Sequence, residues 1–312
     1  MASTRQRKLR KCALGIDVGG TNVRAGLYSQ RDSIVRCLRE ARTQASLPAR
    51  QSLAALSELV QQVVEKGRAA GLAPCNVGIG MPELIGHDGS VDTHCSLPWR
   101  AGELRALFRG YGKVNIMSDV IAASLAEARL GAGRGQPVFL YVTVGTGISC
   151  ALVVDGKPYT GAHGHAISFA SGSTAVGFDK NGRLDAEPLE LRVSGPGILR
   201  RARDLGLKEL DSIAICRSAL MGPGAARTLI DEAATELAMH VAILANQLDP
   251  TLIVLGGGLG SAKGRYWSSF KTAFPKFTFG PHMRRLRLRR AQLGAVAGTI
   301  GAALFASSDL CS

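Results

Sequence analysis

The order of apolar and polar positions along the chain predicts alternating strands and helices. Residues 13–28 carry alternating apolar side chains on both sides of a glycine turn, which is typical of a β-hairpin. From Leu56 the apolar residues recur with helical spacing, and the apolar run 76–80 predicts a buried strand. A short strand over 114–117 and an Ala-rich helix over 120–130 continue the alternation. The first half therefore predicts an α/β arrangement.

The second half begins with the same pattern as the first. Residues 139–157 again form two strand-like runs around a glycine turn, which predicts an internal duplication. A long helix from Ile230, a strand over 252–255 and a final helix over 294–306 follow. Residues 162–196 show little periodicity and many Gly, Ser and Asp, so we expect a long loop that contributes to substrate specificity.

The length of 312 residues favours two domains. The patterns divide the chain into a basic tail at 1–12, an N-terminal lobe at 13–118, a C-terminal lobe at 119–293 with its substrate loop at 162–196, and a C-terminal helical segment at 294–312 that returns to the N-terminal lobe.

The formal net charge of +14 decides little by itself. A positive protein attracts phosphate groups, which suits a nucleotide-binding enzyme and equally suits a nucleic-acid-binding protein. The densest basic run, at 284–290, has leucines at positions 286 and 288, the period of a strand with one solvated face. We therefore favour an exposed strand over a nucleic-acid patch and expect no nucleic-acid partner.

The cysteines and the apolar runs constrain the cellular location. Seven Cys without a C-x-x-C pair do not resemble a secreted disulfide framework, so a reducing cytoplasm is expected. The basic residues 1–12 are followed by a strand-like run instead of the apolar core of a signal peptide. The longest apolar stretch, 138–154, contains glycines and is shorter than the roughly 20 residues of a membrane helix, so no membrane association is expected.

The first candidate site is the glycine-rich turn DVGGTNVR, which begins at Asp17. Glycines at a strand end let backbone N–H groups approach a phosphate, and an acidic side chain beside them can hold hydrated Mg²⁺. An ordinary hairpin with a capping Asp is the alternative. The expected ATP and phosphate ligands are Asp17, Gly19, Gly20, Thr21, Asn22 and Arg24, with Asp17 also holding Mg²⁺ through water.

Two further glycine turns follow strands of the second half. The turn Gly145, Thr146 and Gly147 occupies the mirrored position and would offer backbone donors and a hydroxyl to a polyphosphate. The run Gly256, Gly257 and Gly258 follows the strand LIVL, where the absence of side chains would let a purine and a ribose lie against the backbone. A purely structural turn is the alternative for this last run.

Asp119 is the candidate catalytic residue. It lies between the strand 114–117 and the helix 120–130. A carboxylate can act as a proton acceptor. The alternative is that Asp119 merely caps the helix.

Taken in order, the DxGGTxxR motif, the Asp at a strand-to-helix junction, the GTG turn and the GGG run resemble the ROK family of sugar kinases. Further matches are the G-x-P element at Gly80 and Pro82, the GAxG element at 161–164 and the ending LGAVAGTIGAA at 293–303. The resemblance implies an α/β, two-lobed actin- and hexokinase-like (ribonuclease H-like) fold with duplicated βββαβα domains around a central cleft. It also implies that the two lobes close over ATP, Mg²⁺ and a substrate whose hydroxyl is phosphorylated, with Asp119 as the base.

The departures from the family concern the substrate pocket and the zinc site. Ser118 replaces the first Asn of the family's Asn-Asp-x-Asn sequence, and Ser168 and Ser171 stand where its sugar-binding E-x-G-H element has Glu and His. The zinc-binding run C-x-C-G-x-x-G-C-x-E is missing, although Glu190 occupies the place of its last Glu. No structural zinc is therefore expected.

Two more positions differ, since Glu83 stands where the family commonly has Gly, and Ser96 replaces an Asn. The residues expected to bind the substrate are Pro82, Glu83, Ser96, Ser118, Asp119, His163, Ser168, Ser171 and Glu190.

These departures favour a zinc-independent kinase that phosphorylates a primary hydroxyl of a modified sugar or a sugar-like cyclitol, such as a C7-cyclitol or an amino sugar of natural-product biosynthesis. One alternative is an ordinary glucokinase or fructokinase in which Glu83, His163 or His165 replaces the lost contacts. Another is a catalytically degenerate protein that only binds its ligand. A transcriptional regulator is disfavoured because the phosphate hairpin begins near residue 13 and leaves no room for a DNA-binding domain. The resemblance suggests a homodimer.

Overall fold

The computed structural model describes residues 9–29, 34–44 and 46–307. The chain forms two compact units. Unit 1 comprises Met1–Glu127, Thr160–His165 and Val296–Ser312, and unit 2 comprises Ala128–Tyr159 and Ala166–Ala295. Asp119 thus belongs to unit 1, although the sequence placed it at the start of the second lobe, because the first half of its helix packs within unit 1.

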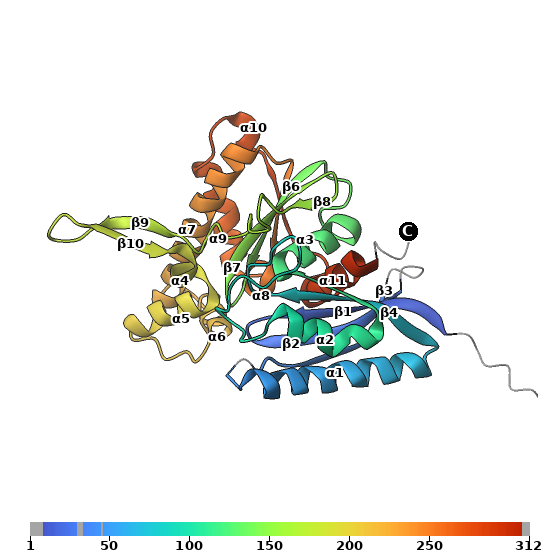
Figure 1. Ribbon diagram of the computed structural model, residues 1–312. Helices are drawn as coiled ribbons and strands as arrows, with labels where there is room; N and C mark the ends of the chain where they lie inside the picture. The colour runs from blue at the N-terminus through green and yellow to red at the C-terminus, as the bar shows by residue number, and fades with distance from the viewer. Residues whose placement is uncertain (1–8, 30–33, 45, 308–312) are drawn as a thin grey trace, which may run out of the picture. The chain divides into compact units, whose positions relative to one another are not determined.

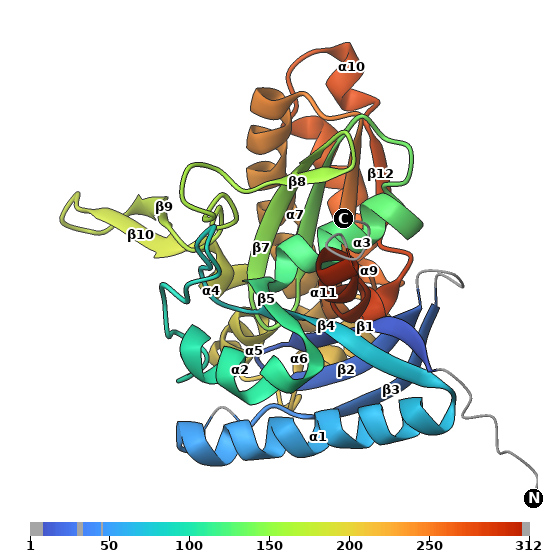
Figure 2. The same cartoon turned by 45° about the vertical axis from the view of Figure 1, so that its right-hand side comes forward.

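Unit 1 is built on a five-stranded sheet in the order β3-β2-β1-β4-β5. The strand β1 is antiparallel to β2, which is antiparallel to β3, and β4 and β5 continue the sheet in parallel. The helices α1 and α11 cover opposite faces of this sheet (Figures 1 and 2). The elements of this part of the chain are β1 (Arg10–Val18), β2 (Asn22–Ser29), β3 (Ile34–Arg42), α1 (Ala49–Ala69), β4 (Leu72–Met81), α2 (Ala101–Phe108), η1 (Arg109–Tyr111), β5 (Lys113–Ser118), α3 (Asp119–Leu130) and α11 (Ala297–Ser307).

The C-terminal helix α11 lies directly on the backbone of β1, β4 and α3. A Cβ atom at Gly15 would overlap the carbonyl oxygen of Thr299, and one at Gly78 would overlap that of Ala302. A Cβ at Gly301 would likewise overlap the carbonyl of Ala122. Glycine at these positions is required by the close approach of backbones, so the final helix is an integral part of unit 1.

Unit 2 repeats the topology of unit 1. Its five-stranded sheet has the order β12-β11-β6-β7-β8, in which β6, β7 and β8 are antiparallel neighbours and β11 and β12 are parallel to β6. The predicted duplication is therefore confirmed. The elements are β6 (Val138–Val144), β7 (Ile148–Val154), β8 (Lys157–Tyr159), β9 (Ser173–Phe178), β10 (Leu184–Pro188), α4 (Leu189–Val193), α5 (Gly195–Asp204), α6 (Ser212–Ser218), α7 (Ala225–Leu248), β11 (Leu252–Gly256), α8 (Gly257–Gly260), α9 (Arg265–Ala273), η2 (Phe274–Lys276), α10 (Pro281–Arg284), β12 (Arg287–Arg290) and η3 (Gly294–Val296).

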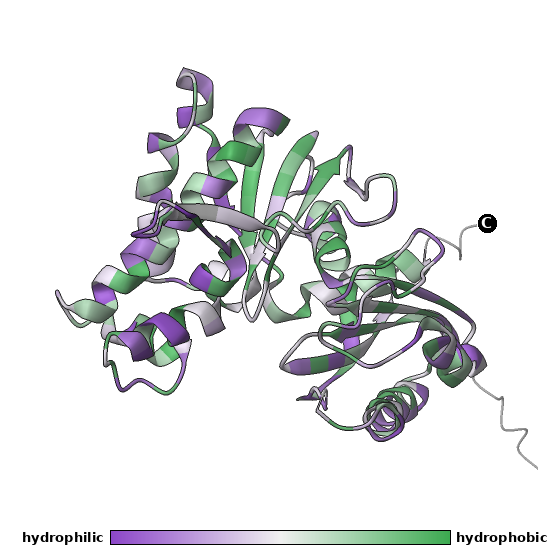
Figure 3. Cartoon of the chain, turned by 60° about the vertical axis from the view of Figure 1, so that its left-hand side comes forward, coloured by the Kyte–Doolittle hydropathy of each residue, from purple (hydrophilic) through white to green (hydrophobic). Residues whose placement is uncertain are grey.

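Each unit has its own apolar core. Alternate residues of β6 pack with β11 against the buried face of α7 in unit 2, and β1 and β4 pack against α1 in unit 1. The central strands are mostly hydrophobic in Figure 3, whereas the helices show polar and apolar faces. Among the described helices, none combines the length and the apolar character needed to cross a membrane.

The segment 162–196 contains more regular structure than its composition suggested. The strands β9 and β10 pair as an antiparallel hairpin that projects from the rest of unit 2 (Figure 1). Its turn contains Asn181 and Gly182, with Gly182 at φ +71° and the Asp179 carboxylate accepting hydrogen bonds from the backbone N–H groups of Asn181 and Arg183. An Asn-Gly pair between strand-like runs is a hairpin signal, so the expectation of a long loop was wrong for this part.

Two smaller expectations also need correction. Strand β1 begins at Arg10, and Cys12 is buried, so the basic tail does not extend to residue 12; residues 1–8 lie outside the described ranges. Within the basic run, Arg284 ends helix α10 and only Arg287–Arg290 form a strand. Arg287 and Arg289 are exposed there, as an edge strand with one solvated face predicts.

Candidate active site

Asp17 and Asp119 come together in unit 1 because their strands are neighbours of β4. Asp17 lies near the end of β1 and is paired with Gly80 of β4, and Asp119 directly follows β5, whose Ser118 is paired with Met81. A Cβ at Gly80 would lie 3.4 Å from the Cα of Asp119 and 3.8 Å from the Oδ1 of Asp17. The parallel strands thus deliver two carboxyl groups to the same edge of the sheet.

Both carboxyl groups have raised pKa values. Burial, and after it the negative charge of Asp17, raise the pKa of Asp119 to about 7, although a hydrogen bond of 2.6 Å from the Val120 N–H acts in the opposite direction. Burial raises the pKa of Asp17 to about 6, against the effect of the Arg24 guanidinium. A carboxyl group whose pKa lies near neutrality is suited to accept a proton and to release it again.

The turn after β1 exposes backbone next to these carboxyl groups. Gly20 is exposed, and the N–H of Gly19 donates to the carbonyl of Asn22 at 2.9 Å. The hydroxyl of Thr43 donates to the carbonyl of Gly19, and the N–H of Thr43 donates to that of Thr21. The turn is therefore supported from β3 and presents the backbone of residues 19–21.

Arg24 has a partner other than a phosphate in this structure. Its guanidinium donates to both carboxylate oxygens of Glu40, at 3.0 and 2.9 Å, directly across the β2–β3 pair. A bidentate pair of this kind fixes the plane of the guanidinium. The predicted phosphate contact of Arg24 would require this ion pair to be shared or broken.

Glu83 accepts hydrogen bonds from the loop 93–97 through its side chain. Its side chain is 3% exposed and accepts four hydrogen bonds, from the Thr93 hydroxyl and from the backbone N–H groups of Cys95, Ser96 and Leu97, at 2.6 to 3.0 Å. These donors occupy both carboxylate oxygens, two on each. The geometry thus gives Glu83 the role of holding the loop 93–97 in place of the predicted substrate contact.

The remaining candidates of unit 1 differ in exposure. Ser118 is buried and Pro82 is half-buried, whereas Ser96 and His163 are exposed. His165 contacts the Asp92 carboxylate through Nε2 at 2.9 Å, and its ring lies 6.5 Å from that of His163. Of the two His considered as substitutes for lost sugar contacts, His165 therefore already has a partner in Asp92.

In unit 2 the structure brings the GTG and GGG motifs together. A Cβ at Gly145 would lie 3.8 Å from the backbone N of Gly258, and the Gly145 carbonyl accepts from the N–H of Gly195 at the start of α5. Thr146, Gly147 and Gly258 are exposed. Two glycine turns and a helix start therefore form one backbone-rich surface, which suits phosphate oxygens.

The first two glycines of the GGG run are also required by packing. A Cβ at Gly256 would overlap the ring of Tyr141, and Gly257 has a φ of +76° and lies against the carbonyl of Val144. Only Gly258 has open space around a Cβ. The structural alternative therefore holds for Gly256 and Gly257 beside any role in nucleotide binding.

Glu190 is held against the GTG turn. Its Oε2 accepts from the N–H of Ile148 at 2.6 Å, and a Cβ at Gly147 would lie 2.8 Å from the same oxygen. The N–H of Glu190 donates to the carbonyl of Ala170, between the exposed residues Ser168 and Ser171. In unit 2, Glu190, Ser168 and Ser171 therefore lie close to the GTG turn at 145–147.

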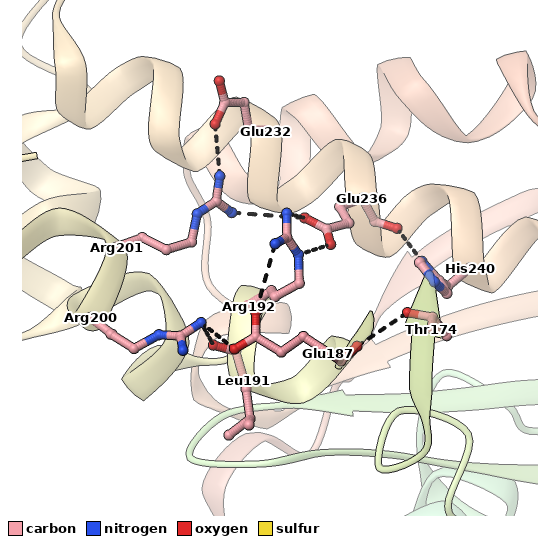
Figure 4. Close-up of polar contacts among 9 residues, drawn as sticks. All are labelled: Thr174, Glu187, Leu191, Arg192, Arg200, Arg201, Glu232, Glu236 and His240. Atoms are coloured by element: carbon pink, nitrogen blue, oxygen red, sulfur yellow. Dashed lines mark hydrogen bonds and ion pairs between the residues drawn. The ribbon is translucent and has the colours of Figure 1, made fainter. Parts of the chain in front are cut away.

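An ion-pair network fixes the helix that carries Glu190 (Figure 4). Arg192 of α4 donates through Nε and Nη2 to the carboxylate of Glu236 of α7, and its Nη1 lies 3.7 Å from Glu187. Arg200 pairs with Glu187 at 2.6 Å, and Arg201 pairs with Glu232 at 2.7 Å. The network ties the base of the β9–β10 hairpin, α4 and α5 to α7.

The residues around Asp17 fit a divalent cation. Two half-buried carboxyl groups in one place repel each other and are costly unless a positive charge or a proton is near. Asp17 would supply hard oxygen ligands through water, as Mg²⁺ requires. Within the described ranges, no three His, Cys, Asp or Glu side chains are grouped as metal ligands would be. The absence of a structural zinc remains a prediction.

The sequence analysis missed two residues that shape the site. A Cβ at Gly298, in the first turn of α11, would overlap the Asp17 carboxylate, so glycine lets this helix start against Asp17. Thr93 donates the shortest side-chain hydrogen bond to Glu83. The small residues of AVAGTIGAA could have indicated the close approach of α11, but no local signal marks Thr93.

The two sheets with the same strand order define the class of the protein, a two-domain α/β fold of the actin and hexokinase type. Residues 13–309 match the ROK family, and the chain belongs to this family. The family predicted from the motifs is thus confirmed.

Three relatives illustrate the similarity. The chain is 30% identical over 303 residues to the bifunctional enzyme NanE/NanK of Brucella melitensis, with 95% of this chain but only 54% of that protein covered, so it spans about half the length of this relative. It is 30% identical over 259 residues to the kanosamine kinase of Amycolatopsis mediterranei, with 80% of each covered. The ROK family glucokinase from Streptomyces griseus, solved in complex with glucose and AMPPNP, has a TM-score of 0.80 at 25% identity, covering 95% of this chain and 99% of that chain.

Proposed function

We propose that this chain is an ATP-dependent carbohydrate kinase that transfers the γ-phosphoryl group of ATP to a hydroxyl of its substrate. The observation that carries this proposal is the pair of half-buried neighbouring carboxyl groups of Asp17 and Asp119 at the ends of β1 and β5. Burial and the neighbouring charge raise the pKa of Asp119 to about 7, which suits a base that must lose and regain a proton near neutral pH. The kinase names of the relatives support the same activity.

Each unit contributes different chemistry to the proposed reaction. Asp119 accepts the proton of the substrate hydroxyl while that oxygen forms a bond to the γ-phosphorus and the bond from this phosphorus to the β-phosphate oxygen breaks, which releases ADP. Asp17 would hold Mg²⁺ through water, and the ion would supply positive charge to phosphate oxygens. The exposed backbone at Gly20 and Gly147 donates hydrogen bonds to phosphate oxygens.

The substrate class that we propose is a modified sugar or a cyclitol with a primary hydroxyl. Ser168 and Ser171 are exposed beside Glu190 and are shorter and uncharged compared with the Glu and His of the family element. The similarity to a kanosamine kinase supports an amino sugar in particular. Glu190, supported by the Ile148 N–H, is the carboxylate that we propose to bind substrate hydroxyls.

An ordinary hexose kinase is the second candidate function. The similarity to a glucokinase solved with glucose and AMPPNP favours it. His163 is the exposed group that could replace a lost sugar contact, whereas Glu83 and His165 already have partners within unit 1.

The test is ATP consumption by the purified protein with Mg²⁺ and a panel of hexoses, amino and N-acetyl sugars, and C7-cyclitols. Turnover confined to amino sugars or cyclitols supports the first candidate, and strong glucose or fructose turnover supports the second. ATP binding without turnover of any compound would instead indicate a protein that has kept the fold and lost catalysis.

A further inference from the structure

Unit 1 contains a hollow away from the candidate active site. It has a volume of about 540 Å³ and is lined by β5, by the end of α2 with η1, by the turn 86–90 and by Phe305 of α11. This volume lies in the range of pockets that bind small molecules. The hollow is lined at Lys113–Ile116, whereas Asp119 follows the opposite end of β5. Ile116, the lining residue of β5 nearest to Asp119, precedes it by three residues, about 10 Å along a strand, and neither Asp17 nor Asp119 lines the hollow.

The lining of the hollow is basic. Arg105, Arg109 and Lys113 contribute three positive charges, and Asp88 is the one acidic side chain among the lining residues. Not counting His87, the lining side chains therefore carry two more positive than negative charges. Clustered like charges repel one another, which costs free energy unless an anion offsets them. A ligand with about two negative charges, as a phosphate monoester carries near neutral pH, would offset this charge.

The basic groups differ in their present partners. One nitrogen of Arg105 donates to the carbonyls of Asp88 and Gly89, at 2.6 and 3.0 Å, and this holds the turn 86–90. The Nε2 of His87 lies 2.9 Å from the carbonyl of Gly161. Arg109 makes no side-chain hydrogen bond or ion pair with another residue in the part of the chain that the structure describes. The turn 86–90 is thus held in place before any ligand binds, and the guanidinium of Arg109 is available to a ligand.

Two further observations indicate more than a simple anion. The side-chain nitrogen of Asn115 is buried in the wall without a hydrogen-bond partner among the described residues. Buried polar groups nearly always have a hydrogen-bond partner, so a ligand atom could supply the missing acceptor. The ring of Phe305 is 41% exposed at the hollow. An apolar ring beside cations and an amide donor suits a polar ring that carries a phosphate, because the ring can pack on Phe305.

We propose that this hollow binds a phosphate monoester of a small polar ring, a hexose phosphate or a compound of the same chemistry. Arg109 and Lys113 bind the phosphate, Asn115 donates to an oxygen of the ligand, and Phe305 packs on its ring. The proposal does not depend on the proposed kinase activity.

Isothermal titration calorimetry with glucose 6-phosphate as the probe, in the presence of saturating AMPPNP and Mg²⁺, tests this site. The double variant Arg109→Gln and Lys113→Gln should weaken binding by about 10²-fold, since it removes charge-assisted hydrogen bonds. The matched control is Lys66→Gln with Arg68→Gln, which makes the same change of charge on the exposed side of α1. An equal loss of affinity in both double variants, or no binding by the wild-type protein at millimolar probe, would overturn the proposal.

Phe305→Leu tests the ring contact. The variant should weaken binding of glucose 6-phosphate by about tenfold, because the loss of aromatic packing costs about 1 kcal/mol, and it should leave the weaker binding of inorganic phosphate unchanged. Equal affinity of wild-type protein for the two probes would contradict a site for a phosphorylated ring. On wild-type protein, hydrogen exchange should slow in 86–90 and 109–116 when glucose 6-phosphate binds; protection confined to 17–21 and 145–147 would place the ligand elsewhere.

Discussion

The two units share one topology but carry different residues at their equivalent turns. The turn after β1 in unit 1 follows Asp17, whereas the corresponding turn after β6 in unit 2 follows Thr143 and carries no acidic residue of its own. Unit 2 brings a carboxylate from elsewhere, since Glu190 of α4 accepts from the N–H of Ile148. The comparison teaches that a repeated fold positions equivalent turns, while the residues added to each turn decide which chemical groups lie beside it.

The units also differ in what holds the site in place. In unit 1, α11 approaches β1 and β4 through glycines at positions 15 and 78, so backbone packing positions Asp17. In unit 2, side-chain ion pairs from Arg192 to Glu236 and Glu187 fix the helix of Glu190. Substitutions of small residues should therefore damage unit 1 most, and loss of charge should damage unit 2 most.

The largest expected effect is that of Asp119→Asn. Removal of the base should lower kcat by about 10² to 10⁴-fold, because general-base assistance contributes this much. Nucleotide affinity should stay close to wild type, since the phosphate-binding backbone is unchanged. Steady-state kinetics with the best substrate of the panel and calorimetric titration of AMPPNP measure the two quantities. Retained turnover would refute the assignment of the base.

The second expected effect is that of Gly298→Ala, which tests backbone packing in unit 1. The new Cβ overlaps the Asp17 carboxylate, and displacement of the carboxylate by about 1 Å should lower kcat by about 10²-fold. Gly102→Ala in α2 is the matched control, because a Cβ there meets nothing within 4 Å. Equal kcat values in the two variants would show that α11 does not position Asp17.

The third prediction concerns pH. Asp119 must be ionised to accept a proton, and its pKa is raised to about 7. The value of kcat/KM should therefore fall about tenfold per pH unit below the pKa and level off above it. A pH–rate profile from pH 5 to 9 measures this. A plateau that extends down to pH 5 would mean that the base has an ordinary carboxyl pKa or lies elsewhere.

The fourth prediction concerns Arg192→Gln in unit 2. This half-buried guanidinium binds Glu236 and lies close to Glu187, so its loss should lower the free energy of unfolding by about 1–3 kcal/mol. Arg200→Gln, which removes a more exposed ion pair, should cost less than about 1 kcal/mol. Urea unfolding compares the two. A larger loss in Arg200→Gln would mean that the network in Figure 4 is not centred on Arg192.

The smallest expected effect is that of a zinc chelator. Dialysis against EDTA followed by return of Mg²⁺ should leave activity and Tm unchanged, because residues 171–190 contain no Cys to bind zinc. Metal analysis of the untreated protein provides the direct measurement. Stoichiometric zinc would contradict our interpretation of this segment.

Local patterns were sufficient where the structure depends on neighbours in the sequence. The glycine turns at 19–20 and 145–147, the strand before Asp119 and the helix after it were all predicted, since each follows from residue spacing and turn chemistry. The Asn181-Gly182 hairpin could have been predicted by the same reasoning and was missed because the surrounding segment 162–196 shows little periodicity and many Gly, Ser and Asp.

The sequence by itself determined the repeated α/β pattern, the family and the position of the carboxylates at strand ends. Only the tertiary structure decided that both oxygens of the Glu83 carboxylate accept hydrogen bonds from Thr93 and the backbone of 95–97. It also decided that position 298 must be a glycine, because a Cβ there would overlap the Asp17 carboxylate. It also gathered Arg109, Lys113 and Phe305 around one hollow. The physical reason is that propensity and periodicity act between near neighbours, whereas burial, hydrogen-bond saturation and the raised pKa of Asp119 depend on groups that only folding brings together.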